Sequence, residues 1–389
     1  MGAQVKTPRF YVDMPTFLHA TGDTRWGYSG YDYHGGVKLL YANPSSPHTI
    51  NSDANGSALG IGIIGASEST HGPTKTAFPI NFCGLLNHNL GDKGEFVFIG
   101  KTNTEIDEDG DPFVPQIKPT IPTGGEVLNL SNGSAADHLK ATWNGTSIFT
   151  FEEMVEYWNT FHIYQGTPQA SKLFQIGSLM VGKYWDAPYN PDLNLTMSRR
   201  FDGIKKQKTV GGKMLANIYY DGPTEWTMYR NSSDIYKYPP FELDTPSAIT
   251  DTTTYNQRAK SGLGRKGLRS WKLNFSYISE DNMWSAYESS SHAPFTPQAT
   301  GFDSITNTDI PQDDGTDVSN YYNPMLQDDS FNFVWNATLG GTLPFIFQPD
   351  NTNNNPDQFA ICTFKNKTLN VKQVAHNVYS IGITIDEVA

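Results

Sequence analysis

The chain has little of what several protein classes require. Among its 389 residues only Cys83 and Cys362 are cysteines, so a framework of several disulfides and a zinc site made of cysteines alone are both excluded. The two could pair, but their wide separation in the sequence favours two buried free thiols. No run of about 18 apolar residues is present, so we expect no membrane-spanning helix. The first residues contain no apolar core of signal-peptide length, so we expect no export by that route.

Charge is also scarce, and positive charge is the scarcer sign. Charged residues make up 17% of the chain, and the excess of Asp and Glu over Lys and Arg leaves a net charge of −12. A general nucleic-acid-binding protein presents a surplus of positive charge to the phosphate backbone. We therefore expect no nucleic-acid partner.

Motifs that carry chemistry are incomplete. Ser67 and Ser69 lie in "GASES", which lacks the second glycine of a nucleophile elbow. Lys266 follows a glycine-rich stretch but precedes Gly267, whereas a phosphate-binding loop requires Ser or Thr after its lysine. The sequence therefore predicts no catalytic residue and no cofactor.

An acidic turn is the nearest approach to a metal site. Asp107, Asp109 and Asp111 lie in "TEIDEDGDP", but the glycine of this stretch is not at the position that an EF-hand loop requires. We predict a solvated acidic turn and no metal site, with calcium binding left open as the alternative.

Features typical of β-structure are abundant. Aromatic residues make up 13% of the chain, and Gly, Pro, Asn and Thr are frequent. Three segments alternate apolar and polar residues with the period of a strand that has one buried face. Their apolar positions are Leu193, Leu195 and Met197, then Trp271, Leu273, Phe275 and Tyr277, and finally Tyr379, Ile381, Ile383 and Ile385. We predict a mainly β chain with few helices.

The pattern along the chain predicts two domains and a connector. Residues 1–145 are expected to form a β-rich N-terminal domain and residues 178–389 an antiparallel β-sandwich domain with a long polar insertion at 280–330. Residues 146–177 are expected to be a helical connector. Thr150 and Glu153 form a capping box there, which places Glu152 and Glu153 on a helix surface, pointing apart, and not in a catalytic pair.

Residues 340–364 predict a β-hairpin. Apolar residues at 343–347 are followed by a polar, Asn-rich stretch, and a second apolar run begins at Phe359. Phe345 and Phe347 should line one face of the first strand, with Ile346 on the other. We interpret the loop as a mechanical element that holds a sheet edge in shape.

Two stretches of opposite charge suggest contact between subunits. Residues 257–272 form a basic stretch, and the insertion at 280–330 is acidic. We expect these two stretches of neighbouring copies to bind each other and set the register of docking, with two solvated loops that make no contact as the alternative. The candidate interface residues are Arg258, Lys260, Arg265, Lys266, Arg269, Asp309, Asp313, Asp314 and Asp317.

The order of several motifs along the chain is similar to that in a known group of proteins. "SRRFDGIKKQKTVGG", "GRKGLRSWKLNFSYISEDNMW", the 340–364 segment and "VKQVAHNVYSIGITIDEV" resemble structural proteins in the virions of tailed bacteriophages, especially marine ones. The opening "TPRFYVDMPTFL" is similar to the start of such proteins, and the order is more distantly similar to distal tail proteins. The resemblance covers the opening dozen residues and most of 191–388.

The resemblance implies a role in assembly. It implies a homo-oligomeric ring or collar in the tail, baseplate or neck, which binds itself and other virion proteins and is assembled in the host cytoplasm. It brings no catalytic residues to transfer. Two alternatives remain: a glycan-binding adhesin, receptor-binding protein or depolymerase that contacts host polysaccharide, and a capsid decoration protein.

Overall fold

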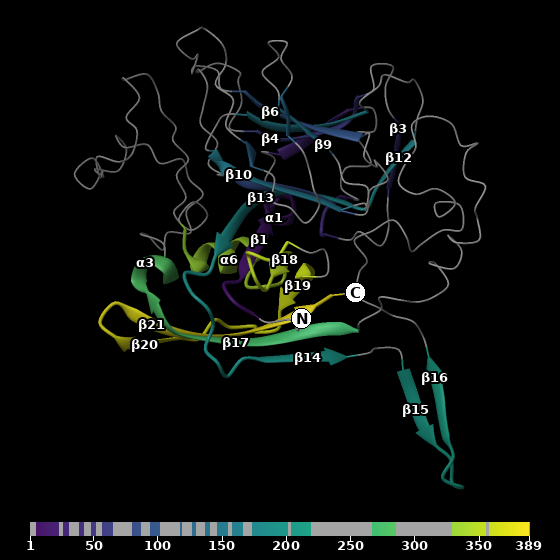
Figure 1. Cartoon of the computed structure of the whole chain (residues 1–389), viewed down its shortest axis with the longest axis vertical. Helices are drawn as coiled ribbons and strands as arrows, with labels where there is room; N and C mark the ends of the chain where they lie inside the picture. The colour runs from purple at the N-terminus through teal and green to yellow at the C-terminus, as the bar shows by residue number, and fades with distance from the viewer. Residues whose placement is uncertain are drawn as a thin grey trace.

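The computed structural model describes part of the chain in seventeen segments. These are residues 5–22, 26–30, 39–42, 48–51, 57–64, 80–86, 94–101, 117–118, 127–129, 137–140, 146–154, 158–165, 173–200, 204–218, 267–284, 329–354 and 358–388. The prediction of a mainly β chain is confirmed, because strands form most of these segments and every strand pairing is antiparallel (Figure 1).

The main sheet has 11 strands in the order β14-β17-β21-β19-β18-β1-β13-β5-β10-β7, with β20 paired to β21 outside this path. Its strands are β1 (Arg9–Asp13), β5 (Ile80–Leu86), β7 (Ile117–Lys118), β10 (Thr146–Met154), β13 (Ser178–Asp186), β14 (Thr196–Arg200), β17 (Leu268–Ser279), β18 (Phe345–Gln348), β19 (Ala360–Phe364), β20 (Val371–Ala375) and β21 (Val378–Glu387). They come from all three predicted segments of the chain. The sandwich arrangement of the C-terminal segment stays a prediction.

A second sheet contains six strands in the order β2-β4-β11-β6-β9-β8. They are β2 (Trp26–Gly30), β4 (Ser57–Ile64), β6 (Gly94–Lys101), β8 (Val127–Asn129), β9 (Asp137–Lys140) and β11 (Trp158–Gln165). Two separate pairs join β3 (His48–Asn51) to β12 (Leu173–Ile176) and β15 (Ile204–Lys208) to β16 (Met214–Ile218). The described helices are α1 (Met14–Thr21), α3 (Glu280–Met283) and α6 (Phe331–Ala337).

Apolar side chains fill both faces of the main sheet around β1. Phe10 and Val12 belong to the larger core cluster, whereas Tyr11, between them, belongs to the other. The Phe10 ring lies 5.2 Å from Phe347 and 6.1 Å from Phe331 of α6, measured between centroids. The strand period of two therefore divides the side chains of β1 between two cores.

The predicted helical connector is wrong. Residues Thr146–Met154 form β10 and Trp158–Gln165 form β11. Ile148 and Phe149 are fully buried, and β10 pairs with both β5 and β7. Aromatic and β-branched residues suit a strand, and pairing with neighbours outweighs a local capping box. Glu152 and Glu153 thus lie in a strand, not on a helix surface.

The predicted alternation in β17 holds for most of its length. Trp271, Leu273 and Phe275 are buried as expected, but Tyr277 is 72% exposed and Ile278 is buried in its place. The register of the β17–β21 pairing shifts between Phe275 and Ile278. Because such an irregularity inserts a residue into one strand, it reverses the faces beyond it.

In the other two alternating segments, the observed burial agrees with the predicted pattern to different extents. Ile381, Ile383 and Ile385 of β21 are buried as predicted. Leu195 and Met197 pack against the larger core cluster, but Leu193 precedes β14 and is fully exposed.

The predicted hairpin at 340–364 is confirmed as β18 paired with β19. Phe345 and Phe347 lie in the larger core cluster and Ile346 in the other. Both cysteines are buried free thiols, as predicted. The interpretation of a sheet edge is wrong, because β18 is bonded to β1 on one side and β19 on the other.

Candidate functional site

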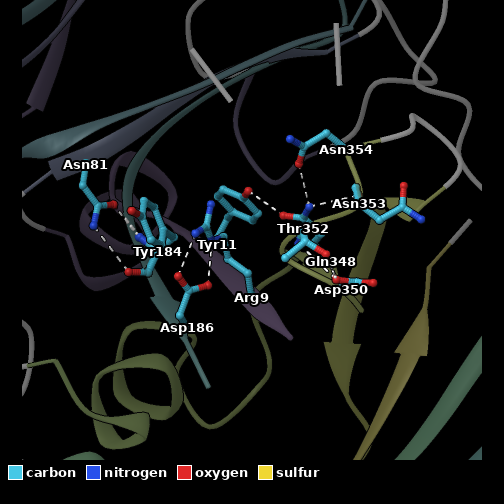
Figure 2. Close-up of polar contacts among 10 residues, drawn as sticks. All are labelled: Arg9, Tyr11, Asn81, Tyr184, Asp186, Gln348, Asp350, Thr352, Asn353 and Asn354. Atoms are coloured by element: carbon cyan, nitrogen blue, oxygen red, sulfur yellow. Dashed lines mark hydrogen bonds and ion pairs between the residues drawn. The ribbon is translucent and has the colours of Figure 1, made fainter. Parts of the chain in front are cut away.

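A half-buried cluster of polar side chains surrounds β1 (Figure 2). The pairing register places Arg9 opposite Asp186 of β13 and Gln348 of β18, and it places Tyr11 opposite Tyr184. Arg9 and Tyr11 share one face of β1, so the sheet brings polar groups from three separate parts of the chain together.

Arg9 and Asp186 form a bidentate ion pair. Arg9 Nε donates to Asp186 Oδ1 at 2.6 Å, and Nη2 donates to Oδ2 at 2.7 Å. The guanidinium carbon lies 4.0 Å from the centroid of the Tyr184 ring, which is within cation–π range. The planar fork of Arg9 is matched to one carboxylate and one ring, and this fixes β1 against β13.

Tyr11 connects β1 to the other neighbouring strand. Its hydroxyl donates to Gln348 Oε1 at 2.8 Å. Gln348 Nε2 in turn donates to the carbonyl of Asn353 at 3.1 Å and to Asn354 Oδ1 at 3.0 Å. Burial raises the pKa of Tyr11 to about 12, so the phenol remains a neutral donor at physiological pH.

The outer residues of the cluster, Asn81 and Asp350, are also bonded to other residues of the cluster or to residues next to it. The Asn81 side chain accepts from the Tyr184 backbone N–H at 2.7 Å and donates to its carbonyl at 3.4 Å. Asp350 Oδ2 lies 3.1 Å from Lys6 Nζ, and its Oδ1 accepts from the Thr352 hydroxyl at 2.6 Å. The polar groups of the cluster thus bond mainly to one another, and these bonds hold β1 between β13 and β18.

The prediction that Arg269 is an exposed interface residue is wrong. It is buried, and its Nη2 and Nε donate to Glu387 at 2.8 and 2.9 Å. Nη2 also donates to the carbonyl of Phe359 at 2.7 Å. This cation is therefore used within its own chain and is not available to a neighbour. The other candidate interface residues (Arg258, Lys260, Arg265, Lys266, Asp309, Asp313, Asp314 and Asp317) and the acidic turn at 107–111 lie outside the described residues.

The β15–β16 pair forms an exposed basic hairpin that the sequence reasoning missed. Lys206, Lys208 and Lys213 are exposed, and Lys206 shares a face with Lys208 and Met214 through the pairing register. Figure 1 shows the pair projecting away from the main sheet beyond the end of β14. Residues 204–218 contain the signal, because three lysines precede a Gly-Gly pair and one lysine follows it directly.

Local hydrogen bonds close the turn of this hairpin. The Thr209 backbone N–H donates to the Lys213 carbonyl at 2.8 Å, and the Thr209 hydroxyl accepts from the Lys213 backbone N–H at 3.0 Å. Gly212 has φ of +83°, the left-handed region that a glycine enters without strain. The turn is therefore closed by bonds between its own residues.

The described geometry defines an antiparallel, mainly β protein, with ion pairs between strands of its main sheet and an exposed basic hairpin. Among the described residues, no group of three or more His, Cys, Asp or Glu side chains could hold a metal ion. In the same part of the chain, no helix has the length and apolar character needed to cross a membrane. A comparison with protein-family models, curated proteins and solved structures found no match for the chain.

Proposed function

We propose that this chain is a structural component of a tailed-phage virion, which forms a homo-oligomeric ring or collar in the tail, baseplate or neck and attaches neighbouring virion proteins. The motif order described above motivates the proposal. Within it, the main sheet, which joins β1, β5, β7 and β10 to the strands of residues 178–389, serves as the rigid part of each subunit.

The observation that carries the proposal is the exposed β15–β16 hairpin. Val210 at its turn is fully exposed, and Met214 and Leu215 are 59% and 50% exposed. Apolar side chains gain free energy when a partner covers them. A two-stranded hairpin alone is marginally stable in water, so a subunit that packs on it would also stabilise its conformation.

The ion pairs that join strands of the main sheet support the same role. Arg9–Asp186 and Arg269–Glu387 tie strands that are far apart in the sequence, and both pairs are bidentate. An assembly protein needs a platform that keeps its shape while its arm binds. The ion pairs and the two core clusters supply such a platform.

Electron microscopy of purified virions tests the proposal. The phage whose genome encodes the chain would be purified, its proteins identified by mass spectrometry, and a map computed. We expect the chain to be present at a fixed copy number, with density for its 11-stranded sheet in a ring or collar. If the chain is absent from particles that are complete and infectious, the proposal is wrong.

A further inference from the structure

The basic hairpin contrasts in charge with the rest of the chain. Residues 196–218 contain six of the 28 Lys and Arg residues but only one of the 40 Asp and Glu residues. The remaining chain therefore carries a large excess of negative charge. Another copy of the same chain consequently offers the hairpin an oppositely charged surface.

Exposed acidic side chains lie at the end of β17 that is distant from the hairpin. Glu280 and Asp281 begin α3, directly after β17, and both are exposed. The hairpin follows β14, which pairs with the opposite end of β17 through Arg200 and Leu268. Figure 1 shows α3 and the β15–β16 pair at opposite ends of this part of the sheet.

The two ends are too far apart to meet within one chain. A strand rises about 3.3 Å per residue, so the length of β17 separates them by about 36 Å. The hairpin also points away from the sheet (Figure 1). A contact between these charges therefore requires two molecules.

We infer that the β15–β16 hairpin of one copy docks on the α3 end of a second copy, in a head-to-tail contact. The inference rests on the proposed function and names the partner and polarity of its assembly. A head-to-tail contact repeats from copy to copy and forms a ring where the rotation closes. Met214, which shares a face with Lys206 and Lys208, supplies apolar contact, while the lysines set orientation and the rate of association.

Charge reversal in the full chain tests the contact. The variant Lys206→Glu/Lys208→Glu changes two exposed cations of the hairpin. The matched control, Lys272→Glu/Lys367→Glu, makes the same change in charge at two exposed cations outside it. Sedimentation equilibrium at several salt concentrations should show oligomers for the parent and the control, and association at least tenfold weaker for the hairpin variant. A parent chain that is monomeric at every concentration, or a hairpin variant that associates like the parent, overturns the inference.

A complementary variant distinguishes a specific contact from a general effect of charge. Glu280→Lys/Asp281→Lys should also associate poorly by itself, because its α3 end then repels the hairpin. Mixing it with Lys206→Glu/Lys208→Glu should restore oligomers, since each hairpin then meets an α3 end of opposite charge. Circular dichroism must match the parent for both variants. If the folded variants remain monomeric when mixed, the α3 end does not receive the hairpin and the inference is wrong.

These outcomes are separable from the proposed function. Association through the hairpin is measured on the purified chain, whereas the structural role is measured on virions. A chain that assembles as inferred but is absent from virions would contradict only the proposed function. If the chain is present in virions but its charge-reversal variants associate like the parent, only the docking inference is contradicted.

Discussion

Arg269 of β17 and Glu387 of β21 form a buried bidentate ion pair although they are 118 residues apart in the sequence. Glu387 Oε2 also accepts from the backbone N–H of Arg269 at 2.8 Å. The Arg269 guanidinium carbon lies 5.1 Å from the Trp271 ring centroid. One carboxylate thus neutralises a buried cation and bonds the strand that carries it.

Removing one partner of this pair should destabilise the fold. Glu387→Gln removes the carboxylate that is paired with the buried Arg269 cation, and breaking a buried pair in this way typically costs about 3 to 5 kcal/mol. Chemical denaturation would measure the loss in free energy of unfolding. Arg269→Met/Glu387→Leu should recover much of that loss, because it removes both charges. A single variant as stable as the parent would show that the pair is not needed.

The Tyr11 hydroxyl should contribute measurably to stability. Tyr11→Phe leaves Gln348 Oε1 without its donor inside the protein, which should lower the free energy of unfolding by about 1 to 3 kcal/mol. Tyr277→Phe removes the same group from a side chain that is 72% exposed, and it should change stability by less than about 0.5 kcal/mol. Equal losses for both variants would contradict the role of the Tyr11 bond.

Gly182 should not tolerate a side chain. A Cβ at this position would lie 2.0 Å from the backbone oxygen of Val12, because β13 and β1 pass closely there. We expect Gly182→Ala to lower the free energy of unfolding by about 1 to 3 kcal/mol or more. Gly211→Ala is the control, since a Cβ there meets no atom within 4 Å. A stable Gly182→Ala variant would refute the close approach.

Asp13 should make stability depend on pH. It caps α1 by accepting from the Thr16 backbone and hydroxyl, and its other oxygen accepts from Val181 N at 3.0 Å. Burial, opposed by these hydrogen bonds, raises the pKa of Asp13 to about 7. A raised pKa means that the folded state holds the proton more tightly than the unfolded chain does, so this stabilising contribution is complete at low pH and is lost as pH rises towards 7.

The measurement compares the parent with Asp13→Asn between pH 5 and pH 8. Each pKa unit corresponds to about 1.4 kcal/mol, so the parent should lose about 2 to 3 kcal/mol relative to the variant across this range. Asparagine also caps helices, so the variant should keep α1 while it removes the titration. Parallel pH curves for the two proteins would contradict a raised pKa at Asp13.

Much of the candidate site was beyond sequence reasoning, for reasons visible in particular residues. The Arg9–Asp186 pair joins positions 177 residues apart, and no local pattern links them. Arg269 looked like one more cation of a basic stretch, because its partner Glu387 lies near the other end of the chain. The β15–β16 hairpin, in contrast, was encoded locally by its Gly-Gly turn and could have been found.

The sequence by itself determined which side chains lie on which face wherever a strand runs without interruption. Phe345 and Phe347 oppose Ile346 as the period of two requires, and both cysteines are buried free thiols. Tertiary structure decided the rest. Strand pairing made β10 from a segment with a helical capping box, and a register shift put Ile278 inside and Tyr277 outside. The physical reason is that local preferences are worth tenths of a kcal/mol per residue, whereas burial and pairing with distant strands contribute several times more.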